Sequence, residues 1–218
     1  MKIGFIGLGA MGAPMARHLA AKGLLAAVGN RSHAKAEALA AELGVAAGAD
    51  ASGFAPCVAV MLCVSADADV LANARALAGV LRPGAIVVDH STVARATAIE
   101  AQEILATGGI GFIDAPVSGG VEGARNGRLS VMCGADPAAL ETVRPALECY
   151  GARVSRMGPV GSGQATKAVN QVMVAGINEA VCEALALGAR LGLDPDLLLP
   201  TLGSGAAANW FLDKRGAT

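Results

Sequence analysis

Short apolar runs alternate with segments of helical length along residues 1–160. Most runs are continuously apolar, which is typical of strands buried on both faces of a parallel sheet. They are KIGFIG (2–7), LAAVGN (25–30), VAVMLCV (58–64), AIVVDH (85–90), GFIDAP (111–116), LSVMCG (129–134) and RVSRMG (153–158). Intervening segments such as 33–43 and 67–81 place their charges so that one apolar stripe stays free. This order predicts a doubly wound α/β domain with a parallel sheet.

The pattern changes after Gly163. Residues 164–191 carry no strand signal and no proline, which predicts one helix of about 42 Å at about 1.5 Å per residue. Ser162 can cap its start, and Gly192 with the following Pro195 marks its end. We therefore expect a first domain over 1–162 and a second, all-helical and incomplete domain over 163–218.

Composition excludes several classes of protein. The chain is 54% hydrophobic, but no apolar run reaches the roughly 18 uncharged residues that a membrane span requires. The net charge of -1 provides no basic surface for nucleic acid, and one Trp and one Tyr provide no set of rings for base stacking. We expect a soluble protein with no membrane or nucleic-acid partner.

The N-terminus and the cysteines favour a cytoplasmic location. The chain begins with a glycine-punctuated strand rather than with a long apolar segment followed by a cleavage site. Its five cysteines are odd in number and scattered, without a CxxC or a Cys/His pairing. We expect free thiols, no disulfide and no metal site.

A GxGxxG motif lies between the first strand and the following helix. It consists of Gly7, Leu8, Gly9, Ala10, Met11 and Gly12. The first glycine permits the tight turn, the second lets a pyrophosphate approach the backbone, and the third allows close packing of helix and strand. Because the motif stands in this strand–helix context, we interpret it as a dinucleotide-binding loop.

The end of the second strand bears on the choice of cofactor. Folds that bind NAD typically place an acidic residue there to hold the ribose 2′-hydroxyl, whereas this chain has Asn30, Arg31 and Ser32. Arg31 can clamp a 2′-phosphate, with Ser32 and Asn30 adding hydrogen bonds. This favours NADP over NAD. Alternatively, Arg31 only stacks on the adenine, which would suit either cofactor.

Two later strands end in polar sequences. DHST (89–92) follows the fourth strand, and DAPVSGG (114–120) follows the fifth. Because ligands bind beyond the carboxyl ends of such strands, both loops are expected at the cofactor crevice. Ser118 with Gly119 and Gly120 suits a carboxylate, although an ordinary turn has the same composition. His90 is more typical of a packing residue than of a base.

Lys167 is the only cation between Met157 and Ala189. Asn170 follows at i+3, on the same helical face. A buried lysine has a lowered pKa, which suits proton transfer to or from a hydroxyl or carbonyl oxygen. A surface lysine that extends its stem to water fits helix geometry equally well.

Four motifs together resemble the β-hydroxyacid dehydrogenases. These are GLGAMGAPMARHL, DHSTV, FIDAPVSGGVEGARNGRLSVMCG and GSGQATKAVNQ, and the resemblance covers nearly the whole chain. The family includes 3-hydroxyisobutyrate dehydrogenases, tartronate semialdehyde reductases and glyoxylate/succinic semialdehyde reductases. The resemblance implies a Rossmann domain joined by a long helix to an all-helical domain, in a homo-oligomer, usually a dimer or tetramer.

The resemblance also implies roles for individual residues. Lys167 would be the general acid/base, and Asn170 would hold the substrate hydroxyl. The substrate carboxylate would bind Ser118, Gly119 and Gly120. The nicotinamide end of the cofactor would lie near Leu62, Cys63 and Thr92. The implied reaction is hydride transfer between a nicotinamide cofactor and a small β-hydroxy acid or semialdehyde acid.

This chain departs from the family in ways that leave alternatives open. Gln171 replaces a second Asn, as in the tartronate semialdehyde reductase branch, and Cys63 replaces a common Pro. Members also continue further at the C-terminus. One alternative is therefore a truncated NADP-binding module without turnover. Others are an enzyme like 6-phosphogluconate dehydrogenase, which usually has His-Asn after its lysine, or an imine reductase, which typically lacks that lysine.

Overall fold

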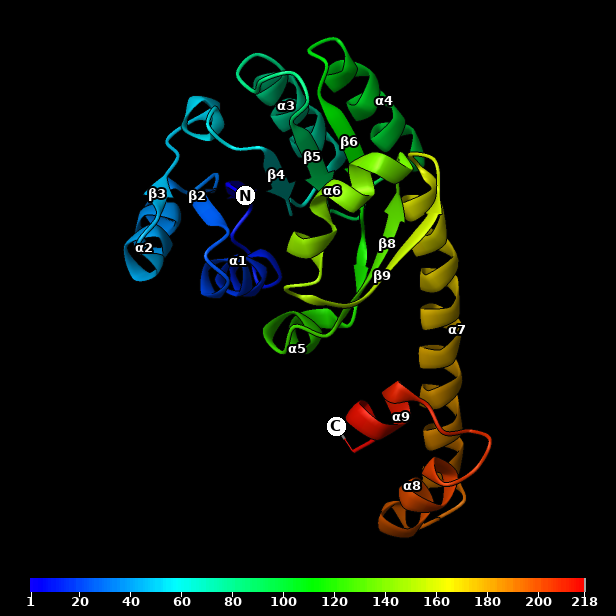
Figure 1. The fold of residues 1–218 in the computed structure, drawn as a ribbon. Helices are drawn as coiled ribbons and strands as arrows, with labels where there is room; N and C mark the ends of the chain where they lie inside the picture. The colour runs from blue at the N-terminus through cyan, green and yellow to red at the C-terminus, as the bar shows by residue number, and fades with distance from the viewer. Residues whose placement is uncertain (218) are drawn as a thin grey trace. The chain divides into compact units, whose positions relative to one another are not determined.

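The computed structural model describes residues 1–217. The chain divides into two compact units, Met1–Lys167 and Ala168–Thr218. The first unit contains a sheet covered by helices, and the described part of the second contains helices and no strand (Figure 1).

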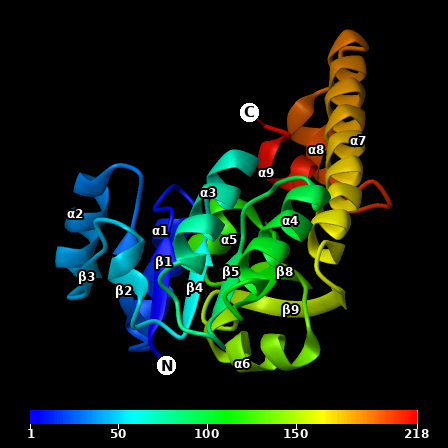
Figure 2. The same cartoon turned by 90° about the horizontal axis from the view of Figure 1, so that it is seen from above.

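Nine strands among the described residues form the sheet of the first unit. They are β1 (Ile3–Ile6), β2 (Leu25–Gly29), β3 (Ala46–Ala47), β4 (Ala59–Leu62), β5 (Ile86–Asp89), β6 (Gly111–Asp114), β7 (Val117–Ser118), β8 (Leu129–Gly134) and β9 (Gly151–Gly158). Their order is β3-β2-β1-β4-β5-β6-β8-β7, and β9 pairs with β8. Figure 2 shows β3 near one edge of this unit and β9 near the other. All seven predicted strands are present.

Helices cover both faces of this sheet. They are α1 (Gly12–Ala21), α2 (His33–Leu43), α3 (Asp67–Ala78), α4 (Arg95–Ala106), α5 (Gly120–Arg125) and α6 (Pro137–Leu147), with a short 3-10 helix η1 (Ala51–Phe54). One buried cluster joins α1, α2 and α6 to the sheet, and a second joins α3 and α4 to it. Two cores separated by one sheet define the predicted doubly wound Rossmann architecture.

One strand runs against the predicted direction. The sheet is parallel from β3 to β6, whereas β8 is antiparallel to β6 and β7. The connection over 119–128 contains only the six-residue α5. A parallel pairing needs a crossover of about a dozen residues or more, so this short connection returns the chain in the opposite direction. β9 is again parallel to β8, after the crossover through α6.

The long helix α7 (Ser162–Arg190) begins in the first unit and continues into the second. Its first turn is not capped as expected from Ser162, which already lies inside the helix. The backbone N–H groups of Gly161 and Gln164 donate to the side chain of Asp114 instead, at 2.7 and 2.8 Å. A buried carboxylate from another strand therefore takes the place of a local cap.

The second unit continues with α8 (Pro195–Gly203) and α9 (Trp210–Arg215). Asp194 caps α8 by accepting from the N–H of Asp196, and Leu212 is buried. Within the described residues, α7 has the length and composition of a helix that could cross a membrane, with a hydropathy of 1.5. Of the 18-residue window that meets this criterion, 6% is buried. Core helices of soluble proteins meet the same criterion.

Candidate active site

The glycine-rich loop after β1 leaves no room for side chains at two of its three glycines. Gly7 has a φ of 98°, and a Cβ there would lie 2.2 Å from the carbonyl oxygen of Cys63. A Cβ on Gly12 would lie 1.9 Å from the carbonyl oxygen of Gly7. A Cβ on Gly9 would meet no protein atom within 4 Å. The loop is thus closed toward the protein and open at Gly9, where a ligand can approach the backbone.

The helix that follows this loop begins without a side-chain cap. The N–H groups of Ala13 and Met15 donate to the backbone carbonyls of Gly9 and Met11, and Pro14 has no N–H. The positive end of the helix dipole nevertheless lies at this turn and suits a pyrophosphate. The adjacent cavity has a volume of about 500 Å³. Its lining includes Gly7, Leu8, Gly9, Asn30, Arg31, Ser32 and Cys63, together with Lys35, Asp50, Ser65, Asp69 and Asn73. This size and donor set fit a dinucleotide.

Asn30 holds the rim of this cavity together. Its side-chain oxygen accepts from the N–H of Leu8 at 3.0 Å, and its amide donates to the carbonyl of Ser32 at 3.2 Å. Both polar ends are thus bonded within the protein, and the expected contact of Asn30 with a phosphate stays a prediction. Ser32 precedes α2 without capping it, and Lys35 lies three residues further on. Two cations and an uncapped helix start therefore adjoin the cavity.

Of the other residues predicted at the cofactor, only Cys63 lines this cavity. Ala10 and Met11 continue the loop into α1. Leu62 is fully buried in β4, whereas Cys63 lines the cavity. Burial raises the pKa of the Cys63 thiol to about 12, so this group is a neutral wall. Thr92 is exposed on the loop after β5.

Sequence reasoning missed Lys35, Asp69 and Asn73. Asp69 and Asn73 come from α3, where the amide of Asn73 donates to the carbonyl of Asp69. The signal for Lys35 was available, because a lysine three residues after Ser32 lies in the first turn of α2. The two α3 residues have no such signal, since only the packing of α3 on the sheet brings them to the cavity.

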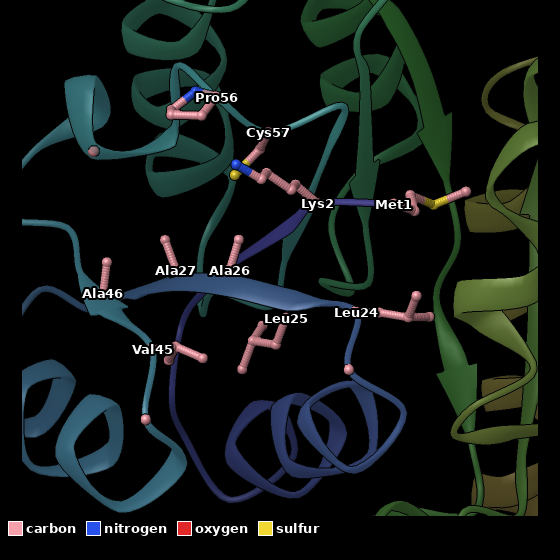
Figure 3. A pocket seen from close by; sticks show the side chains of 13 residues that line it. Met1, Lys2, Leu24, Leu25, Ala26, Ala27, Val45, Ala46, Pro56 and Cys57 are labelled. Atoms are coloured by element: carbon pink, nitrogen blue, oxygen red, sulfur yellow. The ribbon is translucent and has the colours of Figure 1, made fainter.

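A second cavity, of about 510 Å³, lies at the amino ends of β1, β2 and β3 (Figure 3). Lys2, Leu25 and Cys57 contribute to its wall. Figure 3 shows the side chain of Lys2 extending toward Cys57. Burial raises the pKa of that thiol, and the lysine partly offsets this. Since doubly wound folds bind their ligands at the carboxyl ends of the strands, this cavity is distinct from the dinucleotide cleft.

Two buried carboxylates end the central strands. Asp89 and Asp114 are register partners at the ends of β5 and β6. One oxygen of Asp89 accepts from the N–H of Ser91 at 2.9 Å, and the other has no hydrogen-bond partner among residues 1–217. Burial raises the pKa of Asp89 to about 7. Burial also raises the pKa of Asp114, but its backbone donors from α7 oppose this.

His90 is a buried packing residue between these strands. Its Nδ1 lies 2.8 Å from the carbonyl oxygen of Ala115, and its Nε2 lies 2.8 Å from the hydroxyl of Tyr150. Burial lowers the pKa of His90 to about 4, so the ring is neutral. Nδ1 must then donate to the carbonyl, and Nε2 accepts from the tyrosine. Both ring nitrogens are therefore occupied.

Lys167 meets the loop that carries the predicted carboxylate-binding residues. Its Nζ donates to the carbonyl oxygen of Val117 at 2.9 Å, and partial burial lowers its pKa. Ser118 is the next residue of β7, and Gly119 and Gly120 have φ values of 127° and 61°. The ammonium is thus fixed at the residue before Ser118, two residues before the first glycine of this turn.

Asn170 lies on α7 in the second unit, three residues after Lys167. Its amide donates to the side-chain oxygen of Gln171 at 3.0 Å. Among residues 1–217, no group of three or more His, Cys, Asp or Glu side chains is arranged to hold a metal ion. The described chemistry therefore rests on a dinucleotide cleft, a glycine turn and one lysine.

A doubly wound sheet with this glycine loop, cleft and lysine defines a dinucleotide-dependent oxidoreductase. Comparison with known proteins identifies its kind. Residues 2–158 match the NAD-binding domain of 6-phosphogluconate dehydrogenase, and residues 161–218 match the NAD-binding region of NADP-dependent 3-hydroxyisobutyrate dehydrogenase. The chain belongs to the 3-hydroxyisobutyrate dehydrogenase-like β-hydroxyacid dehydrogenases, which are NAD(P)-dependent enzymes acting on CH–OH groups.

Three relatives illustrate the match. An uncharacterized oxidoreductase from Shewanella frigidimarina is 38% identical over 100% of this chain and 76% of its own length. An NAD-dependent L-serine dehydrogenase from Pseudomonas aeruginosa is 36% identical over 97% of this chain and 72% of its own. The structure of Mycobacterium tuberculosis 3-hydroxyisobutyrate dehydrogenase with L-serine has a TM-score of 0.88 and 30% identity, covering 98% and 73% of the two chains.

Substitution of Gly12 and of Gly9 should have different consequences. Gly12→Ala should lower the melting temperature of the ligand-free protein, because its methyl group would overlap the carbonyl of Gly7. Gly9→Ala should leave that temperature nearly unchanged but weaken dinucleotide binding about tenfold or more, because the methyl group occupies the approach path. Calorimetry of both variants tests this. Equal destabilisation by the two substitutions would contradict the geometry.

The raised pKa of Asp89 should make the stability of the protein depend on pH. The contribution of Asp89 to the free energy of unfolding is fully present below the pKa of the unfolded chain, about 3.9. It is lost as the pH rises toward the pKa of Asp89 in the folded protein, about 7. Asp89→Asn removes this titration, while His90 titrates in both proteins. The melting temperature of the variant minus that of the wild type should therefore increase from about pH 5 to about pH 8. A constant difference over this range would show that Asp89 titrates normally.

Proposed function

We propose that this enzyme transfers a hydride between NADP and a small β-hydroxy acid or semialdehyde acid, such as 3-hydroxyisobutyrate or tartronate semialdehyde, with Lys167 as general acid/base. The hydrogen bond from Lys167 Nζ to the carbonyl of Val117 carries this proposal. It holds a partly buried ammonium beside the glycine turn, on the same strand-end edge as the dinucleotide loop.

Lys167 suits proton transfer because of its surroundings. Partial burial destabilises the ammonium and lowers its pKa. In the direction of reduction, Nζ would donate its proton to the carbonyl oxygen of the substrate, and in the direction of oxidation the neutral amine would accept it. The nicotinamide, when bound, supplies or accepts the hydride. The carbonyl of Val117 orients the ammonium without neutralising it, since it accepts a hydrogen bond and carries no charge.

The turn after β7 would bind the substrate carboxylate. Ser118 offers a hydroxyl, and the backbone N–H groups of Gly119 and Gly120 complete a set of donors that suits an anion. The positive φ values of the two glycines give this turn a shape that other residues rarely adopt. Asn170 would hold the substrate hydroxyl. A carboxylate at this turn would bring the neighbouring carbons toward Lys167.

The chemistry at the start of α2 favours NADP. Arg31 and Lys35 both line the cleft, and Ser32 leaves the helix start uncapped. Two cations and a helix N-terminus together suit a 2′-phosphate. The C-terminal match to an NADP-dependent enzyme supports the same choice, whereas the Pseudomonas relative is NAD-dependent.

The relatives also suggest a substrate class. 3-Hydroxyisobutyrate and L-serine appear in their names, and both molecules carry a carboxylate and a hydroxyl on the β-carbon. That spacing matches a site in which one group of donors holds the carboxylate and a separate lysine serves the oxygen. A three- or four-carbon β-hydroxy acid is therefore the proposed substrate.

We further propose that the enzyme is a cytoplasmic homo-oligomer, a dimer or tetramer. The exposed apolar side chains of α7 support an oligomer, since Val169, Val172 and Met173 are 64%, 75% and 62% exposed. A second copy of the chain would cover them. The five cysteines are free thiols, as suits a reducing compartment.

Replacing Lys167 tests the proposed chemistry. NADPH oxidation with a panel of small semialdehyde acids should be measured for the wild type, for Lys167→Ala, and for Lys22→Ala as a control on the surface of the first unit. Lys167→Ala should lower kcat by about 10²–10⁴-fold, with NADPH binding retained, and Lys22→Ala should change little. Turnover that survives loss of Lys167 would sink the mechanism. NADPH binding without any turnover in the wild type would support the binding-module alternative.

The cofactor choice is tested by titrating NADPH and NADH against Arg31→Ala and Lys35→Ala. Each substitution should weaken NADPH binding by about 10–100-fold, as expected for the loss of a charge-assisted hydrogen bond. NADH binding should change far less. Arg82→Ala, which removes an exposed cation outside the cleft, serves as the control. Equal affinity of the wild type for both cofactors would contradict the preference.

A further inference from the structure

The first turn of α7 is fastened to the end of β6 by a buried carboxylate. Asp114 is fully buried, and its two oxygens accept from the N–H groups of Gly161 and Gln164, at 2.7 and 2.8 Å. These two donors would otherwise lack partners inside the helix. The carboxylate therefore satisfies the helix start and determines where it lies against the sheet.

A second attachment joins the same turn to the loop after β5. The side-chain amide of Gln164 donates to the carbonyl of Ser91 at 2.8 Å and accepts from the N–H of Val93 at 3.2 Å. Gln164 is only 3% exposed. A buried amide with both ends bonded holds its helix turn in one orientation, because any rotation leaves a buried polar group without a partner.

Lys167 closes a ring of contacts with these groups. It follows Gln164 by three residues, about one helical turn, and its Nζ donates to the carbonyl of Val117. Val117 in turn follows Asp114 by three residues. The segment 114–117 is held separately, since Ala115 accepts from His90 and donates to the carbonyl of Asp89 at 2.7 Å. The strand end and the helix start are thus joined at two places, at Asp114 and at Val117.

Close packing leaves the ring little freedom to shift. A Cβ on Gly163 would lie 2.4 Å from the carbonyl oxygen of Met132 and 2.6 Å from that of Asp114. A Cβ on Gly134 would lie 2.2 Å from a carboxylate oxygen of Asp114. Glycines on both sides therefore let helix backbone, strand backbone and carboxylate meet directly.

We propose that Asp114 and Gln164 are positioning residues for Lys167: they fix the first turn of α7 to the ends of β6 and β5, and so place the lysine Nζ at the substrate. This inference rests on the proposed role of Lys167 as acid/base. Neither residue touches the reacting atoms. Their loss releases the helix turn, and the ammonium then leaves the position from which it transfers a proton.

The expected consequence is a loss of turnover rather than of cofactor binding. Displacing a reacting group by about 1 Å costs on the order of 10²-fold in rate, and residues that orient a functional group commonly contribute about 10–100-fold. Asp114→Asn retains one acceptor but turns an amide donor toward a backbone N–H. Gln164→Met keeps the length of the side chain but removes both of its hydrogen bonds. Each should lower kcat by about 10–100-fold, with the KM for NADPH little changed.

A double-mutant cycle tests this. Asp114→Asn and Gln164→Met are each made in the wild type and in Lys167→Ala, and kcat and both KM values are measured. Asp136→Asn is the matched control, because Asp136 accepts from the N–H groups of Ala138 and Ala139 at the start of α6, outside the ring. In the Lys167→Ala background, Asp114→Asn and Gln164→Met should cause no further loss of kcat. The control should leave kcat unchanged, and because Asn caps a helix as well as Asp does, it should change the melting temperature little.

Two results separate the failure of this inference from that of the proposed function. If Lys167→Ala retains full activity, the acid/base role is wrong and the inference falls with it. If Lys167→Ala loses activity but Asp114→Asn lowers kcat by the same factor in both backgrounds, only the inference is overturned. If Asp114→Asn does not fold, Gln164→Met, which leaves the carboxylate in place, decides between the same outcomes.

Discussion

The bond between the Asp114 carboxylate and the first turn of α7 is the interaction on which the site depends. It brings a charged group, a helix start and a strand end together in the buried interior, where unpaired polar groups are costly. With that contact in place, Lys167 lies one turn from the sheet at the carbonyl of Val117. The lysine is therefore positioned by backbone geometry, and its own side chain needs only one hydrogen bond to complete the arrangement.

The first unit uses two helix starts in opposite ways. The start of α1 has no side-chain cap and directly follows the glycine loop that lines the dinucleotide cleft, so the positive end of its dipole is available to a ligand. The start of α7 is capped by the protein's own carboxylate, so its donors are used for positioning. The glycines at these two helix starts differ in a similar way. Gly9, before α1, faces open space, whereas Gly163, in α7, packs against backbone atoms. Equivalent chemical groups thus serve binding at one position and rigidity at the other.

The sequence predicts the strands well because strands buried on both faces of a sheet need apolar residues at successive positions, and these appear as continuous apolar runs. Periodicity carries no information on strand direction, so the reversal of β8 appears only in the structure. The local sequence predicts Ser162 as the cap of α7, whereas the acceptor in the structure, Asp114, lies 47 residues from Gly161 in sequence. The proposed role of Lys167 came from resemblance, since helix geometry fits a surface lysine equally well. The network that holds Lys167 depends on contacts between distant segments, which local patterns do not encode.

The pH dependence of the chemical reactivity of Lys167 shows directly whether its ammonium is held in a partly buried position. Acylation of this residue by an amine-reactive reagent can be followed by mass spectrometry as a function of pH. We expect a midpoint below that of a lysine in a simple peptide, about 10.4, because partial burial lowers the pKa of the ammonium. Reactivity with the midpoint of an exposed lysine would contradict this expectation, since the ammonium would then extend into water.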